Sequence, residues 1–372
     1  MGYVAVKGGN EAIEKACQLF VHERTKGLSR PLGIDQIKEQ LYLAIDRVMG
    51  EGSLYAPDLA ALALKQSAGD TFEASFMLRA FRATQERLGY SLPVSTEKMR
   101  VVRRISSAFK DIPGGQILGA TSDYTLRLLD FDLLKDDAAR RSAFRERLFD
   151  SLPADAEIPS TFPKVISILR REGLLAETVE AAHKEGGLSD ITRQPLTFPA
   201  SRSASLQALA RGETGGMLAL AYSSMRGYGN IHPTLGELRI GYLPLTMPHP
   251  VTGKPFVVGE VKVTEADVLA RMQGSDGVPR FSLGYGICFG QNEIKAISMA
   301  ILDRCTRTEK PDSPSEDQEF VLYHIDGIEA MGFCNHWKLP HYVDFLSDLD
   351  RLRKAQDMAR AKKLQENIHA DT

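Results

Sequence analysis

Two histidines near the end of the sequence, His336 and His341, are the residues best suited by type and spacing to bind a metal ion. Imidazole and thiolate are the usual protein ligands of zinc and related metals, and Cys334 lies close by. On an unbroken α-helix, residues five positions apart point roughly 140° away from each other. Pro340 lies between the two histidines and disfavours an unbroken helix, because proline lacks the backbone N–H and clashes with the preceding turn. A bend at Pro340 would turn both rings toward one ion.

The same residues are also compatible with a packed corner of the fold. Aromatic residues, Leu339 and Val343 surround the two imidazoles in sequence, as they would in an apolar cluster with hydrogen-bonded histidines. Zinc sites normally take three or four protein ligands, so two histidines form an incomplete set. Either Cys334 completes the set or a second chain supplies the missing ligand.

A second group of chemically useful residues is a concentration of arginine and glycine in the middle of the chain. Its members are Arg202, Arg211, Arg226 and Arg239, with Gly227 and Gly229 directly after Arg226. The planar fork of arginine matches phosphate oxygens, and glycine lets backbone N–H groups come close to an anion. We therefore predict a phosphate-rich ligand held by this group, with Arg211 outside the cradle itself. The alternative is that the arginines form surface ion pairs and the glycines only make turns.

Two acid–base candidates, His232 and Glu237, lie beside the arginines. A histidine can exchange protons near neutral pH, and a glutamate can stabilise a cationic ring or orient an acceptor. A histidine before a proline is more often structural, and a glutamate in such a region is more often ion-paired.

Glycines in residues 281–290 (FSLGYGICFG) precede a predicted helix, where free N–H groups can hold phosphate. The stretch is neither a Walker A loop nor a GxGxxG motif. Close packing or a bulge explains glycine within a strand equally well.

Both helices and strands are predicted to position these residues. Helical spacing of apolar residues predicts helices over residues 37–48 and 57–68 and a third that begins after Asp70. Alternation predicts an antiparallel hairpin from residues 240–247 and 255–263, and a further strand over 281–289. We predict an α+β fold with a helical N-terminal layer, a mixed or antiparallel sheet region and a long C-terminal helix.

Four regions follow from this reading. We expect a mainly helical region over 1–131, a variable insertion or linker over 132–165, a Gly/Arg-rich α+β region over 166–345, and a basic helix with a tail over 346–372.

The composition argues against several classes of protein. The 372 residues carry a formal net charge of −2, so no global basic field attracts nucleic acid. No apolar run approaches the roughly 20 residues that span a bilayer. The four cysteines are scattered and form neither a CxxC pair nor a disulfide framework. We expect a cytoplasmic protein that binds neither nucleic acid nor membranes.

Several segments together resemble one family. They are residues 4–9 (VAVKGG), 44–49 (AIDRVM), 59–66 (LAALALKQ), 110–116 (KDIPGGQ), 218–223 (LALAYS), 226–229 (RGYG) and 339–345 (LPHYVDF). In these segments the chain is similar to the I subunit of the bacterial carbon–phosphorus lyase core complex, the PhnI family. The similarity extends from Tyr3 to about Leu352.

The resemblance implies a transferase that helps bacteria use phosphonates. With its companions, the I subunit of that family displaces adenine from ATP by methylphosphonate and forms α-D-ribose 1-methylphosphonate 5-triphosphate. Alone it is regarded as a purine nucleosidase. The implied partners are the core subunits G, H and J, of which J is a radical S-adenosylmethionine enzyme, and the ABC-type subunits K and L.

The resemblance also implies a role for the histidine pair. In the family, an H-x4-H element of the I subunit and a cysteine of the J subunit hold a zinc ion, and His336 and His341 match that element. Cys334 does not belong to the family pattern as a regular feature. The alternative to the enzyme is a non-catalytic scaffold that positions the radical S-adenosylmethionine subunit.

Overall fold

The computed structural model describes residues 9–151, 159, 162–176, 188–226, 232–274 and 276–370. The chain divides into two compact units, one formed by Met1–Pro31 with Ile328–Thr372 and the other by Leu32–Gly327. The four regions expected from the sequence stay a prediction.

The larger unit begins with a layer of four helices, as expected. They are α2 (Ile34–Gln40), α3 (Tyr42–Gly52), α4 (Pro57–Gln66) and α5 (Thr71–Ala83). Their shared core is built from buried side chains such as Ile45, Val48 and Leu78. Asp70 caps α5 by accepting hydrogen bonds from the backbone N–H groups of Phe72 and Glu73.

One detail of this layer differs from the sequence prediction. The helix expected over residues 37–48 is interrupted at Leu41, whose backbone (φ −111°, ψ 33°) is not helical. The Leu41 side chain is exposed, whereas Ile37 and Ile45 are buried. The apolar spacing is helical on both sides of the break, so periodicity alone could not reveal it.

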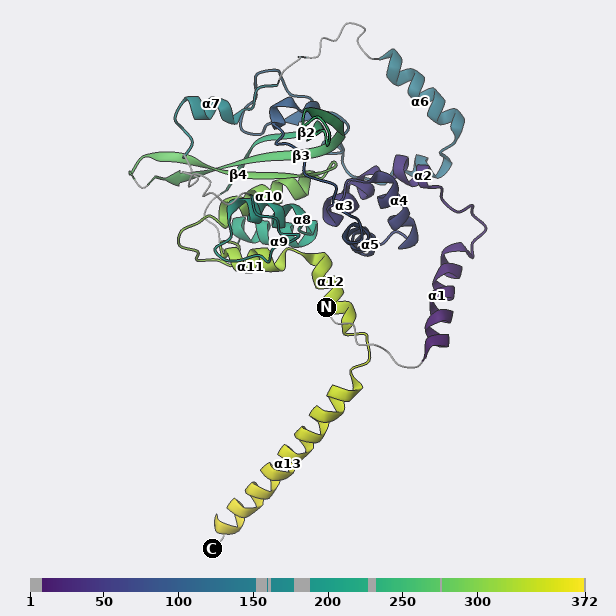
Figure 1. Ribbon diagram of the computed structural model, residues 1–372, viewed down its shortest axis with the longest axis vertical. Helices are drawn as coiled ribbons and strands as arrows, with labels where there is room; N and C mark the ends of the chain where they lie inside the picture. Colours follow the sequence, from purple (N-terminus) through teal and green to yellow (C-terminus); the bar gives the residue numbers. More distant parts are fainter. Residues whose placement is uncertain are drawn as a thin grey trace. The chain divides into compact units, whose positions relative to one another are not determined.

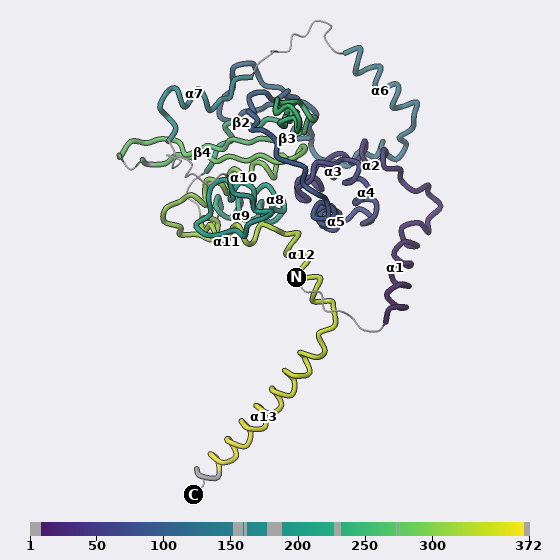
Figure 2. The backbone as a smooth tube through the Cα atoms, in the orientation of Figure 1, coloured from purple at the N-terminus to yellow at the C-terminus, as the bar shows by residue number. Residues whose placement is uncertain are grey.

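A four-stranded sheet forms the centre of the larger unit (Figure 1). It contains β1 (Arg100–Ile105), β2 (Thr234–Pro248), β3 (Pro255–Gln273) and β4 (Pro279–Phe289). The strands lie in the order β1-β2-β3-β4 and all pairs are antiparallel. Figure 2 shows the chain passing directly from β2 to β3 and then to β4. The predicted hairpin and the predicted α+β class are confirmed, and the hairpin strands are longer than expected.

Helices cover one face of this sheet. They include α8 (Arg202–Arg211), α9 (Thr214–Met225), α10 (Glu293–Cys305) and α11 (Gln318–His324), which share a core with Leu238 of β2 and Ala266 of β3. A side chain on Gly284 or Gly286 of β4 would come within 1.9 Å of the Ala300 oxygen or 2.1 Å of the Ala296 oxygen. These two glycines therefore serve close packing of α10 on β4.

The larger unit contains four further described helices. They are the 3-10 helices η1 (Thr96–Lys98) and η2 (Phe131–Lys135) and the α-helices α6 (Ala138–Asp150) and α7 (Ile166–Arg171).

The smaller unit contains α1 (Asn10–Thr25), most of α12 (Gly327–His336) and α13 (Tyr342–Ala370). The predicted long C-terminal helix is α13. None of the helices in the described part of the chain combines the length and apolarity that crossing a bilayer requires.

Candidate functional site

The two predicted metal ligands meet at the junction of α12 and α13. His336 is the last residue of α12, and His341 directly precedes α13. Pro340 lies in the short connection, and the bend places the Nε2 atoms of the two rings 2.8 Å apart. The expectation that a bend would turn both rings to one side is confirmed in the geometry.

The hydrogen bonds of His341 determine which of its nitrogens is available. Its Nδ1 lies 2.5 Å from the Leu339 carbonyl oxygen, which can only accept, so Nδ1 carries the proton and donates. The lone pair of a neutral His341 is therefore on Nε2, which faces His336. Without an ion, the His336 Nε2–H donates to this lone pair. A metal would replace that proton and bind both nitrogens.

The pair fits half of a zinc site. Two Zn–N bonds of about 2.0–2.1 Å at a tetrahedral angle separate the nitrogens by roughly 3.3 Å, so the rings need to open by only about half an ångström. Cys334 lies two positions before His336 on α12, which turns its thiol roughly 160° away. In the described parts of the chain, no group of three or more histidine, cysteine, aspartate or glutamate residues is arranged to hold a metal.

Exposed aromatic and apolar side chains surround the histidine pair. Trp337 stacks on His341 with 25° between the rings, and Phe333 lies 5.6 Å from the His336 ring. Trp337 is 67% exposed and Phe345, in the first turn of α13, is 63% exposed. Exposed aromatics around a polar centre are typical of surfaces that bind another protein.

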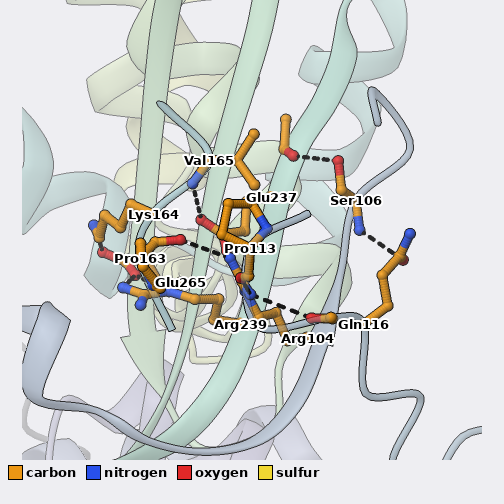
Figure 3. A network of polar contacts seen from close by, with 12 residues as sticks. Arg104, Ser106, Pro113, Gln116, Pro163, Lys164, Val165, Glu237, Arg239 and Glu265 are labelled. Atoms are coloured by element: carbon orange, nitrogen blue, oxygen red, sulfur yellow. Dashed lines mark hydrogen bonds and ion pairs between the residues drawn. The ribbon is translucent and has the colours of Figure 1, made fainter. Parts of the chain in front are cut away.

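A second candidate site is an ionic network on the sheet face opposite α10 (Figure 3). Arg104 of β1 donates through Nε to Oε1 of Glu237 at 2.5 Å, and both side chains are almost fully buried. The other oxygen of Glu237 accepts the Val165 N–H at 3.1 Å. Arg104 also donates to the Pro163 carbonyl oxygen at 2.7 Å. The segment before α7 is thus fastened to the sheet by charged hydrogen bonds.

Glu265 of β3 is the centre of the same network. It accepts from Nε of Arg239 at 3.0 Å, from Nζ of Lys164 at 2.6 Å and from the Tyr285 hydroxyl at 2.9 Å. Burial alone would raise the pKa of Glu265, but the charges of Arg239 and Lys164 hold it below its ordinary value. Burial and the neighbouring Glu265 charge raise the pKa of the Tyr285 hydroxyl, which therefore stays a donor.

Asp267 is the unusual member of this network. Burial, with help from the charge of Glu265, raises its pKa from 3.8 to about 7. Its Oδ1 is buried and has no hydrogen-bond partner in the described structure, and the same holds for Nη1 of Arg239. Asp267 lies opposite Glu237 on β2 and opposite Tyr285 on β4. The sheet face thus holds a carboxyl group whose proton is lost near neutral pH rather than near pH 4.

Comparison with known proteins decides the family. Residues 2–359 match the family model described as bacterial phosphonate metabolism protein (PhnI). The chain belongs to the PhnI family.

Named relatives within this family are similar over almost their whole lengths. A putative C-P lyase subunit protein, HtxH, from Stutzerimonas stutzeri is 54% identical over 98% of this chain and 99% of its own. The PhnI subunits of alpha-D-ribose 1-methylphosphonate 5-triphosphate synthase from Rhizobium meliloti (strain 1021) and Escherichia coli (strain K12) are 46% and 45% identical. Those two matches cover 96% and 95% of this chain, and 97% and 98% of the relatives.

The arginines proposed as a cradle in this PhnI-family chain do not all meet in one place. Arg202 begins α8 and binds Asp303 of α10 at 3.3 Å, on the helix-covered side of the sheet. Arg239 lies on the opposite face, because neighbouring residues of a strand point to opposite sides and Leu238 packs in the helix-covered core. Arg226 is exposed at the C-terminal cap of α9.

The remaining predicted site residues differ in how far they are exposed to solvent. His232 is exposed two residues before β2, whereas Glu237 is buried in its pair with Arg104. Gly227 and Gly229 lie outside the described residues.

Sequence reasoning missed the partners of Glu237 and Arg239. Arg104 pairs with Glu237, and Glu265 pairs with Arg239. Lys164 also pairs with Glu265, and Asp267 lies opposite Glu237 in the neighbouring strand. A signal was present in residues 263–269 (VTEADVL), where two carboxylates two positions apart interrupt an apolar strand. Such spacing places both on one face of a sheet.

Proposed function

We propose that this chain is a subunit of a carbon–phosphorus lyase complex that displaces adenine from ATP by methylphosphonate. The product would be α-D-ribose 1-methylphosphonate 5-triphosphate. The proposal is supported by the names of the relatives from Rhizobium meliloti and Escherichia coli, which are subunits of the synthase for that compound. Its partners would be the core subunits G, H and J and the ABC-type subunits K and L, and alone it would act as a purine nucleosidase.

The observation in the structure that best supports this function is the histidine pair. His336 and His341 present two converging Nε2 atoms at a rim of exposed aromatics. A cysteine of the J subunit would complete a zinc site there. When bound, zinc would connect the two chains and provide a Lewis acid at an open position. We assign the zinc no part in adenine displacement.

The reaction sets requirements for the rest of the site. Departure of adenine leaves positive charge on the ribose and is easier when the base is protonated. The protein must hold the triphosphate, donate a proton near the purine and exclude water from the acceptor position.

The three arginines predicted as a cradle cannot all contact one triphosphate, because Arg202 and Arg239 lie on opposite faces of the sheet and pair with Asp303 and Glu265. We propose that Arg226 binds the triphosphate, together with Gly227 and Gly229, which follow it in the sequence. Because Arg226 is exposed, it can contact the ligand directly, whereas Arg239 is committed to Glu265.

His232 is the proposed acid–base group, and Glu237 is a proposed positioning residue. The exposed imidazole of His232 can approach a purine, so we propose it as the proton donor. Glu237 accepts from Arg104 and from the Val165 N–H, so it would act by orienting the strand that carries it.

The direct test is adenine release by the complex. The chain is co-expressed with its partner subunits, and the purified complex receives ATP with and without methylphosphonate. We expect adenine and the ribose methylphosphonate product when both substrates are present. Absence of adenine in both conditions would refute the enzymatic function.

The scaffold alternative is favoured by one observation. Glu237 and Arg239 are buried and paired within the chain, as structural residues are. If His232→Ala and Arg226→Ala leave adenine release by the complex unchanged, the reaction takes place on another subunit and this chain is the scaffold.

A further inference from the structure

Three arginines gather where α5 approaches the end of α8, and we call Arg79, Arg82 and Arg211 the arginine cluster. Arg79 and Arg82 lie three positions apart on α5, so their side chains are neighbours on one face of that helix. Arg79 donates through Nη2 to the carbonyl oxygen of Arg211, the last residue of α8, at 3.3 Å. Two helices therefore bring the three arginines into one neighbourhood.

The cluster contains more positive than negative charge. Asp326 accepts through both oxygens from Nη1 of Arg79 at 2.8 Å, and its Oδ2 also lies 3.3 Å from Nε of Arg211. These two arginines thus share one carboxylate. Among the described residues, Arg82 has no carboxylate partner, and its Nη1 donates to the Ser53 carbonyl oxygen at 3.2 Å.

The other charges nearby do not remove this excess. Glu51 and Glu213 both bind Arg47, at 3.1 and 2.6 Å, and Glu51 also interacts with the charge of Lys295. These two acids and two bases balance one another. Carbonyl oxygens at the ends of α3 and α8 face the cluster, but a helix C-terminus carries only about half an elementary charge. The cluster therefore keeps positive charge that the described residues do not neutralise.

The electrostatic cost of this excess falls on Arg82. Burial and the positive charges of the other two arginines of the cluster lower the pKa of its guanidinium. Arg87 adds to this effect, and Asp190, which pairs with Arg87 at 2.5 Å, opposes it more weakly. Because an arginine stays protonated at neutral pH, the repulsion persists until an anion relieves it.

The burial of the cluster suits a small ligand. The side chains of Arg79 and Arg211 are 11% and 27% exposed, and Arg82 is half-buried. Partial burial makes an ionic contact stronger than it would be in bulk water, while solvent still reaches the side chains. An anion can therefore enter the cluster and be held there.

The chemistry of the cluster indicates which class of anion fits. The planar guanidinium fork matches the oxygens of a phosphate group. A phosphate group carries about −1.5 to −2 charges at pH 7 and presents three acceptor oxygens, whereas a carboxylate carries one charge on two oxygens. Three forks with excess positive charge therefore match a phosphorus oxyanion better than a carboxylate.

We propose that the arginine cluster is a binding site for a small phosphorus oxyanion, a phosphate or phosphonate dianion. Arg82 and Arg211 bind its oxygens, and Asp326 holds Arg79 in place beside them. Arg226 lies at the far end of α9, whose 12 residues span roughly 18 Å. The site is therefore separate from the proposed triphosphate contact and does not depend on the proposed function.

The test measures anion binding to the full-length chain by isothermal titration calorimetry in a phosphate-free buffer. The probes are inorganic phosphate, methylphosphonate and ATP, which separate a free dianion from the phosphate chain of a nucleotide. Acetate is the carboxylate control. The wild type is compared with Arg82→Gln, Arg211→Gln and Arg24→Gln, the last of which replaces an exposed arginine of α1.

We expect at least one of the three phosphorus oxyanions to bind the wild type and Arg24→Gln with equal affinity. The same anion should bind Arg82→Gln and Arg211→Gln about ten-fold more weakly or less, because each loses a charge-assisted contact. Arg82→Lys keeps the charge without the fork, so its affinity should be intermediate.

Thermal unfolding separates binding from a purely structural role of Arg82. The bound anion should raise the Tm of the wild type but not that of Arg82→Gln, because only a protein that binds the anion is stabilised by it. A structural role alone predicts that the anion raises the Tm of both proteins equally or of neither.

Three results would overturn the proposal. The wild type could bind none of the three phosphorus oxyanions, or it could bind acetate as tightly as it binds them. The third is an affinity for these anions that is the same in the wild type, Arg82→Gln and Arg211→Gln.

Discussion

At the scale of single residues, the structure separates two kinds of ionisable group. His336 and His341 direct their Nε2 atoms toward each other, next to exposed aromatic side chains. Glu237 instead pairs with Arg104, and Arg239 pairs with Glu265, on the buried face of the sheet. The first arrangement is open to an external ion, and the second lies beside Asp267, whose pKa is raised by burial and by the charge of Glu265.

Asp267 should make the stability of the chain depend on pH. Its pKa of about 7 in the folded state exceeds the ordinary 3.8, so the folded chain keeps this proton to higher pH than the unfolded chain. This contribution is fully present below about pH 4 and is lost as pH rises to 7. Urea titrations from pH 4 to 8 should show a flatter profile for Asp267→Asn, which should be more stable than wild type at pH 8 by a few kcal/mol.

The control for this prediction is Asp357→Asn on exposed α13, which should keep the wild-type profile. Equal pH profiles for wild type and Asp267→Asn would mean that folding does not raise the pKa of Asp267.

Arg226 should contribute to nucleotide binding. Arg226→Ala should raise the ATP concentration needed for half-maximal adenine release by about ten-fold or more, because a charge-assisted contact to phosphate is worth roughly 1.5–3 kcal/mol. Arg193→Ala, which removes another exposed arginine, is the matched control. Unchanged ATP dependence in Arg226→Ala would exclude this arginine from the cradle.

At the scale of elements, local signals predicted the fold class and part of the architecture, but not β1, α8 or α9. Asp70 marked the start of α5, and the alternation of residues 255–263 marked half of the central hairpin. The break at Leu41 was not predictable, because the apolar spacing continues across it. The partners of Glu237 were not predictable either, since Arg104 and Val165 are distant in sequence and approach only through the sheet and the segment before α7.

The glycines of β4 offer a test of how closely α10 packs. Gly286→Ala should destabilise the chain by about 3 kcal/mol, because the new methyl group would lie 2.1 Å from the backbone oxygen of Ala296. Gly33→Ala is the control, since its nearest neighbour would be the Gln36 side chain at 3.4 Å. Urea denaturation measures both. Similar stability of the two variants would show that β4 and α10 are farther apart than described.

At the scale of the whole molecule, exposed apolar side chains mark surfaces for other chains. The exposed aromatics at the histidine pair lie in the smaller unit, whereas ten exposed large apolar side chains between residues 124 and 150 lie in the larger unit. From the sequence, the histidine pair could be recognised and its bend anticipated from Pro340. The missing third ligand could not be found by inspection of this chain, because no described residue supplies it.

The most direct test of the proposed shared zinc site counts zinc in the assembled complex. The complex is purified with wild-type chain, with His336→Ala, with His341→Ala and with His22→Ala, in which an exposed histidine of α1 is replaced. Zinc is measured only on complexes that still contain the J subunit. We expect one zinc per copy of this chain in the wild type and in His22→Ala, and its loss in the other two. Stoichiometric zinc retained in both His336→Ala and His341→Ala would contradict the account.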